Sequence, residues 1–190
     1  MQHKATKVTT RTKVLTSAAL LAAVGVGLAG AVSASADAPA AAPVAAPAAL
    51  KAKSTFSSDH LTARAATDAA RAALDAAEKE GQRVTVAVVD RNGNTVVTLR
   101  GDGAGPQSYE SAIRKAYTAV SWNAPTSELA KRLQSAPNLK DIPGTLFLAG
   151  GAPVAKDNAP IAGIGVAGAP SGDLDEKFAR AGVDAISNGS

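Results

Sequence analysis

From residue 61 onward, the hydrophobic positions follow helical and strand periods in turn. Ser58 or Asp59 can cap a helix that runs from residue 61 to about residue 80, where Gly81 ends the pattern. The apolar stripe of this helix consists mostly of alanine: Leu61, Ala65, Ala69, Ala73, Leu74 and Ala77. Because these side chains are small, we expect the helix to lie close against a sheet.

A β-hairpin is the clearest element that the pattern predicts. Residues 83–90 and 95–100 are rich in β-branched side chains, and they flank the pair Asn92-Gly93, which favours a two-residue turn with positive φ angles. The first of these strands is apolar on both faces, which predicts a central position in the sheet.

Helices and strands also follow each other in the rest of the chain. A second helix is expected from a cap at Ser108 to Trp122, a short third helix from a cap at Thr126, and a last helix from Asp173-Leu-Asp-Glu176, which has capping-box spacing. Three further strands are expected at residues 145–149, 152–156 and 163–167. The resulting order, α-ββ-α-α-βββ-α, predicts an α+β domain in which helices pack on an antiparallel sheet.

The first 55 residues have a different composition. Residues 1–13 are polar and basic, residues 14–32 are almost wholly apolar, and Ala34-Ser35-Ala36 offers the small residues that a signal peptidase reads. Residues 1–36 are therefore predicted to be a secretory signal peptide, although the apolar run also suits an uncleaved membrane anchor. The Ala/Pro-rich residues 37–55 are predicted to form a flexible tether, and residues 56–190 to form the folded domain. We expect the protein to be secreted and either extracellular or associated with the cell wall.

The net charge of +4, from 20 basic and 16 acidic residues, is concentrated in this leader. The leader contains four basic residues and no acidic residue, so 16 residues of each sign remain after residue 36. A neutral remainder lacks the concentrated basic surface that nucleic-acid binding requires, so nucleic acid is not expected as a partner. No membrane span is expected after cleavage.

Few side chains are available for chemistry. Cysteine is absent, which excludes thiol catalysis, disulfides and Cys-ligated zinc or iron–sulfur clusters. His60, the single histidine after the leader, is a candidate metal ligand, with a solvated side chain as the alternative. Asp75 and Glu78 lie three residues apart on one helix face, which suits weak binding of iron or simply a solvated surface. Tyr109 and Tyr117 on the second helix are candidates for haem ligation, or for packing or interface contact. No residues are assigned a catalytic role.

Several motifs resemble the GlcG/HbpS family. They are Val84–Asp90 with Gly93, Lys115–Ala119, Pro143-Gly144 with Gly150–Pro153, and Gly163–Gly168. The motifs cover nearly the whole domain in the right order, and the leader, the tether and residues 142–151 are most similar to the HbpS branch. That branch comprises extracellular haem-binding proteins that act with a membrane sensor histidine kinase.

The resemblance implies a profilin-like α+β fold with a five-stranded antiparallel sheet, and a homo-oligomer that is expected to be an octamer. It also implies that haem binds through an oxygen ligand, and the position that carries over is Thr145, with Phe147 in the same segment. Iron binding in the family is expected at a Glu-x-x-Glu pair on the second helix. Here Glu110 matches the first position, but Ile113 occupies the second, so this sequence departs from the family pattern.

These features predict a secreted haem-binding accessory or sensor protein. It would report haem or redox status, and so oxidative stress, to the sensor histidine kinase of a two-component system, with haem as cofactor and iron ions as a second ligand. The alternative is a haem-degrading or other small-molecule enzyme on the same fold, which the scarcity of general acid–base residues disfavours. A third interpretation is an interaction module whose oligomer is the functional object.

Overall fold

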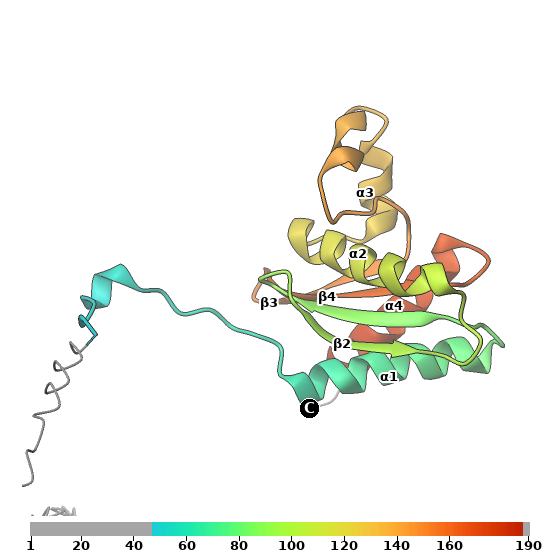
Figure 1. Cartoon of the computed structure of the whole chain (residues 1–190), viewed down its shortest axis with the longest axis horizontal. Helices are drawn as coiled ribbons and strands as arrows, with labels where there is room; N and C mark the ends of the chain where they lie inside the picture. Colours follow the sequence, from blue (N-terminus) through green and yellow to red (C-terminus); the bar gives the residue numbers. More distant parts are fainter. Residues whose placement is uncertain (1–46, 188–190) are drawn as a thin grey trace, which may run out of the picture. The chain divides into compact units, whose positions relative to one another are not determined.

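The computed structural model describes residues 47–187, and every helix and strand in it belongs to the unit formed by residues 50–190 (Figure 1). The predicted signal peptide and most of the predicted tether lie outside the described residues. Residues 47–60 are exposed and contain one short 3-10 helix, η1 (Ala52–Ser54). Within the described part of the chain, no helix combines the length and the apolar character that crossing a membrane requires.

Helix α1 (Ala63–Lys79) packs through small side chains, as predicted. The residues that it buries are Ala66, Ala69, Ala70, Ala73 and Ala77. Its predicted cap is wrong, because the N-cap is Thr62, whose hydroxyl oxygen accepts a hydrogen bond from the Ala65 N–H at 3.1 Å. Asp59 is too far ahead of the helix to reach these N–H groups and forms an exposed ion pair with Lys156 instead.

The sheet is antiparallel and has four strands in the order β2-β1-β4-β3. The strands are β1 (Thr85–Asp90), β2 (Thr95–Arg100), β3 (Gly151–Lys156) and β4 (Ala159–Ala167). The central position predicted for the first strand is confirmed, since β1 lies between β2 and β4. The α+β fold is also confirmed, but the expected count of five strands is wrong, because residues 47–187 contribute four strands to the sheet.

The missing strand is the segment 145–149, which has an irregular backbone. Its amide groups bond to side chains and to a turn rather than to a neighbouring strand. The Leu146 N–H donates to the Thr118 hydroxyl oxygen at 2.8 Å, and the Thr145 N–H donates to the Ile142 carbonyl at 3.3 Å. Because the first of these partners lies on a helix, the segment runs against that helix and does not extend the sheet.

The turn type that was predicted for the first hairpin occurs in the second hairpin instead. In the β1–β2 turn, Gly93 alone has a positive φ, of 87°, and the Asp90 carboxylate accepts hydrogen bonds at 2.8 Å from the N–H groups of both Asn92 and Asn94. The two-residue turn with positive φ angles is instead the β3–β4 turn, at Asp157 (49°) and Asn158 (66°). The aspartate side chain therefore stabilises a longer loop where the sequence suggested the shorter one.

Helices cover both faces of the sheet (Figure 1). α1 and α4 (Gly172–Ser187) pack on one face, and α2 (Pro106–Trp122) packs on the other, with α3 (Thr126–Arg132) and η2 (Pro137–Asp141) beyond α2. The α1/α4 face is aliphatic, and its central residues are Val84, Val86, Val88, Ile164 and Val166, together with Phe178 of α4. This face forms the main hydrophobic core.

Three predicted caps are replaced by neighbouring residues. α2 begins at Pro106, so Ser108 lies inside the helix, where its hydroxyl bonds to the Thr85 hydroxyl at 2.7 Å. The N-cap of α3 is Pro125, and the Thr126 hydroxyl oxygen accepts the Gly151 N–H at 2.7 Å instead. The cap of α4 is Ser171, whose hydroxyl oxygen accepts the Leu174 N–H at 3.2 Å. Ser108 and Thr126, which were predicted as caps, therefore each join two elements that are distant in sequence.

Candidate functional site

The segment that carries Thr145 lies against α2. The Thr145 side chain is largely buried, with 7% of the residue exposed, and its hydroxyl donates a hydrogen bond to the Ile142 carbonyl at 2.7 Å. Because the hydroxyl hydrogen is used in this bond, the lone pairs of the oxygen remain available to an acceptor role or to a metal ion. Ile142 and Leu148, on either side, are exposed hydrophobic residues.

Phe147 points away from the surface. Its ring makes an edge-on contact with Trp122, with the ring centres 5.2 Å apart, and it shares a small core with Ala124 and Leu129. Only 4% of Phe147 is exposed. Its observed role is therefore to anchor the segment to the α3 side of the molecule.

The two candidate tyrosines lie in different surroundings. Tyr109 is exposed near the start of α2. Tyr117 is half-buried and faces two glycines, since a Cβ atom built on Gly93 would lie 2.9 Å from its Cε2 atom and one built on Gly144 would lie 3.7 Å from its Cε1 atom. Tyr117 therefore fills the space between the β1–β2 turn and the beginning of the Thr145 segment, whereas Tyr109 does not contact either glycine.

The candidate metal ligands are dispersed over the surface. Glu110 bonds to Arg114 through two guanidinium nitrogens, at 2.9 and 2.7 Å, and half-buried Ile113 occupies the position where the family pattern has an acid. Asp75 and Glu78 are exposed on α1, and exposed His60 lies 3.1 Å from the Ser58 hydroxyl. Among residues 47–187, no group of three or more histidine, cysteine, aspartate or glutamate side chains is close enough together to hold a metal ion.

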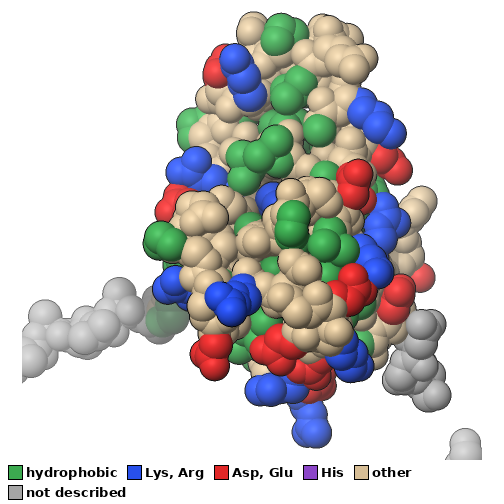
Figure 2. All heavy atoms as spheres, turned by 90° about the vertical axis from the view of Figure 1, so that its right-hand side faces the viewer, with side chains coloured by type: hydrophobic (Ala, Val, Ile, Leu, Met, Phe, Trp, Pro, Cys, Tyr) green, Lys and Arg blue, Asp and Glu red, His purple; other side chains and the backbone are tan. Residues whose placement is uncertain are grey.

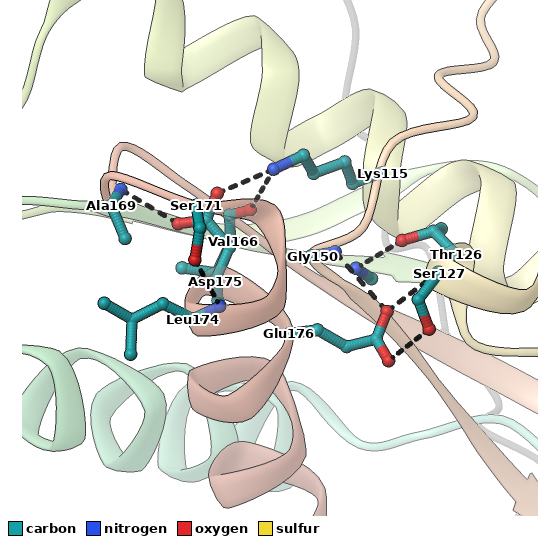
Figure 3. Close-up of polar contacts among 11 residues, drawn as sticks. Lys115, Thr126, Ser127, Gly150, Val166, Ala169, Ser171, Leu174, Asp175 and Glu176 are labelled. Atoms are coloured by element: carbon teal, nitrogen blue, oxygen red, sulfur yellow. Dashed lines mark hydrogen bonds and ion pairs between the residues drawn. The ribbon is translucent and has the colours of Figure 1, made fainter. Parts of the chain in front are cut away.

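A buried ion pair that the sequence analysis missed joins α2 to α4 (Figure 3). The Lys115 ammonium contacts the Asp175 carboxylate at 2.8 Å and the Val166 carbonyl at 3.0 Å, and the two side chains are 6% and 5% exposed. Asp175 also accepts the Ala169 N–H at 3.0 Å. Burial raises the pKa of Asp175, and the hydrogen bonds from Lys115 and Ala169 offset this effect only in part.

Glu176, the next residue, is a second buried acid (Figure 3). Its carboxylate accepts the Ser127 N–H at 2.9 Å and the Ser127 hydroxyl at 2.8 Å, pairs with Arg180 at 2.8 Å and lies 3.5 Å from the Gly150 nitrogen. Burial alone would raise the pKa of Glu176, but the hydrogen bonds from Arg180, Ser127 and Gly150 outweigh it and lower the pKa. The carboxylate thereby holds the end of the Thr145 segment and the start of α3 against α4.

A sequence signal for this pair existed but was weak. Lys115 stands between Ala112, Ala116 and Ala119, all on the buried side of α2, so a charged residue at that position requires a buried partner. Asp175 and Glu176 follow directly after the start of α4, where acidic residues are common for a different reason, namely the helix dipole. Their burial depends on the position of α4 relative to α2, which local sequence does not specify.

The fold defines the class of protein: a small α+β domain with an antiparallel sheet between helices. Residues 61–184 match the family model described as "Haem degrading protein HbpS-like", and the chain belongs to the HbpS-like family. The resemblance found in the sequence motifs is thus confirmed.

Solved structures agree with this assignment. The crystal structure of a double glutamate-to-aspartate mutant of HbpS from Streptomyces reticuli is 74% identical to the chain, with a TM-score of 0.73, and covers 74% of this chain and 97% of that one. A crystal structure of HbpS is 76% identical, with a TM-score of 0.70 and coverage of 71% and 96%. The complex of PduOC with haem is 28% identical, with a TM-score of 0.61 and coverage of 67% and 95%.

A curated relative shares only part of its length with the chain. The corrinoid adenosyltransferase PduO of Salmonella typhimurium is 32% identical over 124 residues, which make up 63% of this chain but 37% of PduO. The chain therefore spans little more than a third of that protein.

Proposed function

We propose that the protein binds haem. The observation that carries this proposal is its membership of the HbpS-like family, whose model covers residues 61–184, together with the solved haem complex of the related PduOC domain. When bound, haem would supply an iron centre that can change its oxidation state.

The donor chemistry of the described residues is compatible with an oxygen ligand. The chain has no cysteine, its one methionine is Met1, and His60 is an exposed residue that precedes α1. Thr145 offers a hydroxyl oxygen whose proton is already donated to Ile142. A neutral hydroxyl is a weak ligand, so most of the affinity would come from burial of the apolar porphyrin surface.

Exposed apolar residues flank Thr145 in the sequence: Ile142 is 40% exposed and Leu148 is 58% exposed. On the face of the molecule that Figure 2 shows, hydrophobic side chains are scattered among uncharged groups, and most charged side chains lie towards its edges and lower part. A porphyrin has two faces, and a single chain would cover one of them with these side chains. A second copy would cover the other, which favours a homo-oligomer, and we extend the proposal to the octamer that the family resemblance implies.

The finer proposal is that the protein is secreted and reports haem or redox status to the extracellular domain of a sensor histidine kinase. Its support is the leader in residues 1–36, which lies outside the described residues, and the resemblance to the HbpS branch. Iron ions would be a second ligand. Of the Glu-x-x-Glu pair that the family resemblance implies for iron, this chain retains the first residue, Glu110.

A haem titration followed by visible absorption tests the central claim. We expect a saturable Soret shift, and we expect the affinity for haem to be at least tenfold lower in Thr145→Ala than in the wild type. The matched control is Thr67→Ala on α1, because the Thr67 hydroxyl also donates to a backbone carbonyl, that of Ala63, but lies on an exposed helix surface. Equal affinities of Thr145→Ala and the wild type would remove Thr145 from the site, and a spectrum identical to that of free haem would refute haem binding.

Haem degradation is the second candidate function, because the matched family model is described as haem degrading. Incubation of the protein with excess haem and a reductant separates the two functions. Progressive loss of the Soret band over more than one haem per chain indicates turnover, whereas a stable spectrum indicates binding alone. Signalling is tested separately by measuring binding to a kinase ectodomain with and without haem, and equal affinities would contradict haem sensing.

A further inference from the structure

Two adjoining cavities have the Lys115–Asp175 ion pair in their lining. Their volumes are about 340 and 180 Å³, and both are lined by Lys115, Leu148, Ala169 and Asp175. The larger cavity extends towards the start of α4 at Ser171–Asp173, and the smaller one extends towards the start of α2. Buried charged groups at the base of a concave site are common in ligand-binding sites.

One face of α2 supplies polar groups to the smaller cavity. Gln107, Ser111 and Lys115 are spaced four residues apart, so their side chains follow one another along the same side of the helix, and all three line this cavity. They provide an amide, a hydroxyl and an ammonium group. Leu146 and Leu148 form an apolar wall of the cavity. The site therefore combines several hydrogen-bonding groups with a hydrophobic surface.

The charges of the site indicate which ligands it suits. The positive charge of Lys115 is already balanced by Asp175 at 2.8 Å, and Asp173 adds a negative charge to the lining of the larger cavity. An anionic ligand would therefore meet an unfavourable field. Lys115 has three N–H groups, of which Asp175 and the Val166 carbonyl take two. A hydroxyl group can accept the third and donate to a free lone pair of the Asp175 carboxylate.

We infer that this cavity binds a small uncharged molecule that carries hydroxyl or carbonyl oxygens, such as a polyol, through Lys115, Asp175 and the polar face of α2. The site adjoins the proposed haem surface, with which it shares Leu148, but Thr145, Phe147, Tyr109 and Tyr117 line neither cavity. The inference therefore goes beyond the proposed function, and a failure of haem binding leaves it untouched.

An NMR titration of the protein with glycerol tests the inference, with sodium acetate at equal ionic strength as the charged comparison. The Lys115 ammonium signal and the backbone amides of Ser111 and Ala169 are the reporters. We expect these signals to shift together and to saturate with glycerol, with acetate at least fivefold weaker. Shifts that do not saturate would refute a binding site, and tighter binding of acetate than of glycerol would refute an uncharged ligand.

Two variants locate the binding. Ser111→Leu should fill the cavity and weaken glycerol binding at least fivefold, whereas Ser121→Leu, at an exposed position of the same helix, should leave the affinity unchanged. Leu148→Ala removes part of the apolar wall. Because Leu148 is 58% exposed, we expect this variant to fold even if Ser111→Leu does not. It should weaken binding two- to threefold. Wild-type affinity in both cavity variants would overturn the inference.

Discussion

The two faces of the sheet contact their helices in different ways, one through bulky side chains and the other through a close approach of backbones. On the α1/α4 face, branched aliphatic side chains fill the space between sheet and helices, with Ile164 and Val166 of β4 next to Phe178 of α4. On the α2 face, glycines of β4 let the helix backbone approach directly: a Cβ atom at Gly163 would overlap the Ala116 carbonyl, and one at Gly165 would overlap the Ala112 carbonyl.

The difference has consequences for function. Because α2 lies so close to the sheet, the Lys115 ammonium reaches both the Val166 carbonyl of β4 and the Asp175 carboxylate of α4. Side chains in the aliphatic core can repack when their volume changes, but a contact between two backbones has no such freedom. We therefore expect the α2 face to tolerate change less than the α1/α4 face does.

The largest effect is expected from Gly165→Val. The added side chain would collide with the α2 backbone at Ala112 and Ala116, neither of which can rotate away. We expect a loss of more than about 5 kcal/mol, which is enough to unfold a marginally stable domain. Circular dichroism at 25 °C would report this loss. A variant that unfolds in urea at the wild-type midpoint would mean that α2 can move away from the sheet.

The next effect is expected from Lys115→Met, which leaves the Asp175 carboxylate buried without its cation. Breaking a buried pair on one side costs about 3–5 kcal/mol, and the double variant Lys115→Met/Asp175→Leu should recover much of that loss because no charge stays buried. Urea unfolding monitored by the fluorescence of Trp122, the single tryptophan, measures both variants. A double variant less stable than the single one would contradict this account.

A smaller, pH-dependent effect is expected from Glu176→Gln. The folded state lowers the pKa of Glu176, so the ionised carboxylate contributes stability above the ordinary carboxyl range, and this contribution is lost as the pH falls through the lowered pKa. We expect Glu176→Gln to cost about 2 kcal/mol at pH 7 and less at pH 3, as measured by urea unfolding.

Asp175→Asn provides the matched comparison because the folded state raises the pKa of Asp175. Ionised Asp175 therefore lowers the free energy of unfolding. This loss of stability is relieved as the pH falls from the raised pKa of the folded state to the ordinary pKa of the unfolded state. Relative to Asp175→Asn, the wild type should therefore gain stability on acidification, opposite to the trend for Glu176. Parallel pH profiles for the two variants would contradict the assigned pKa directions.

The smallest effect is expected from Ile164→Val on the aliphatic face. It removes one methylene group from a fully buried side chain of β4, next to Gly165 in sequence but on the opposite face. We expect a loss of about 1 kcal/mol, with the fold retained, by urea unfolding. A loss as large as that of Gly165→Val would remove the proposed difference between the two faces.

Much of the fold was predictable because its signals are local. The alanine stripe of α1 and the apolar run of β1 specify their own buried faces, and the strand limits at 95–100 are those observed. The irregular backbone of the segment 145–149 was not predictable in this way, because the apolar segment resembles a strand by composition. Its amides are taken instead by Thr118 and by a turn at Ile142, which the segment meets only after α2 has docked on the sheet.

The sequence by itself determined the order of helices and strands outside the segment 145–149, the central position of β1, the absence of thiol chemistry and the family motifs. These depend on side-chain periodicity, on composition and on residues that are close together in the chain. The tertiary structure alone decided that Lys115 and Asp175, 60 residues apart, form a buried pair beneath a cavity, and that Phe147 belongs to a core. Such contacts depend on the packing of α2 and α4 on opposite faces of one sheet. The distance between two packed helices is not specified by residues that are neighbours in the sequence.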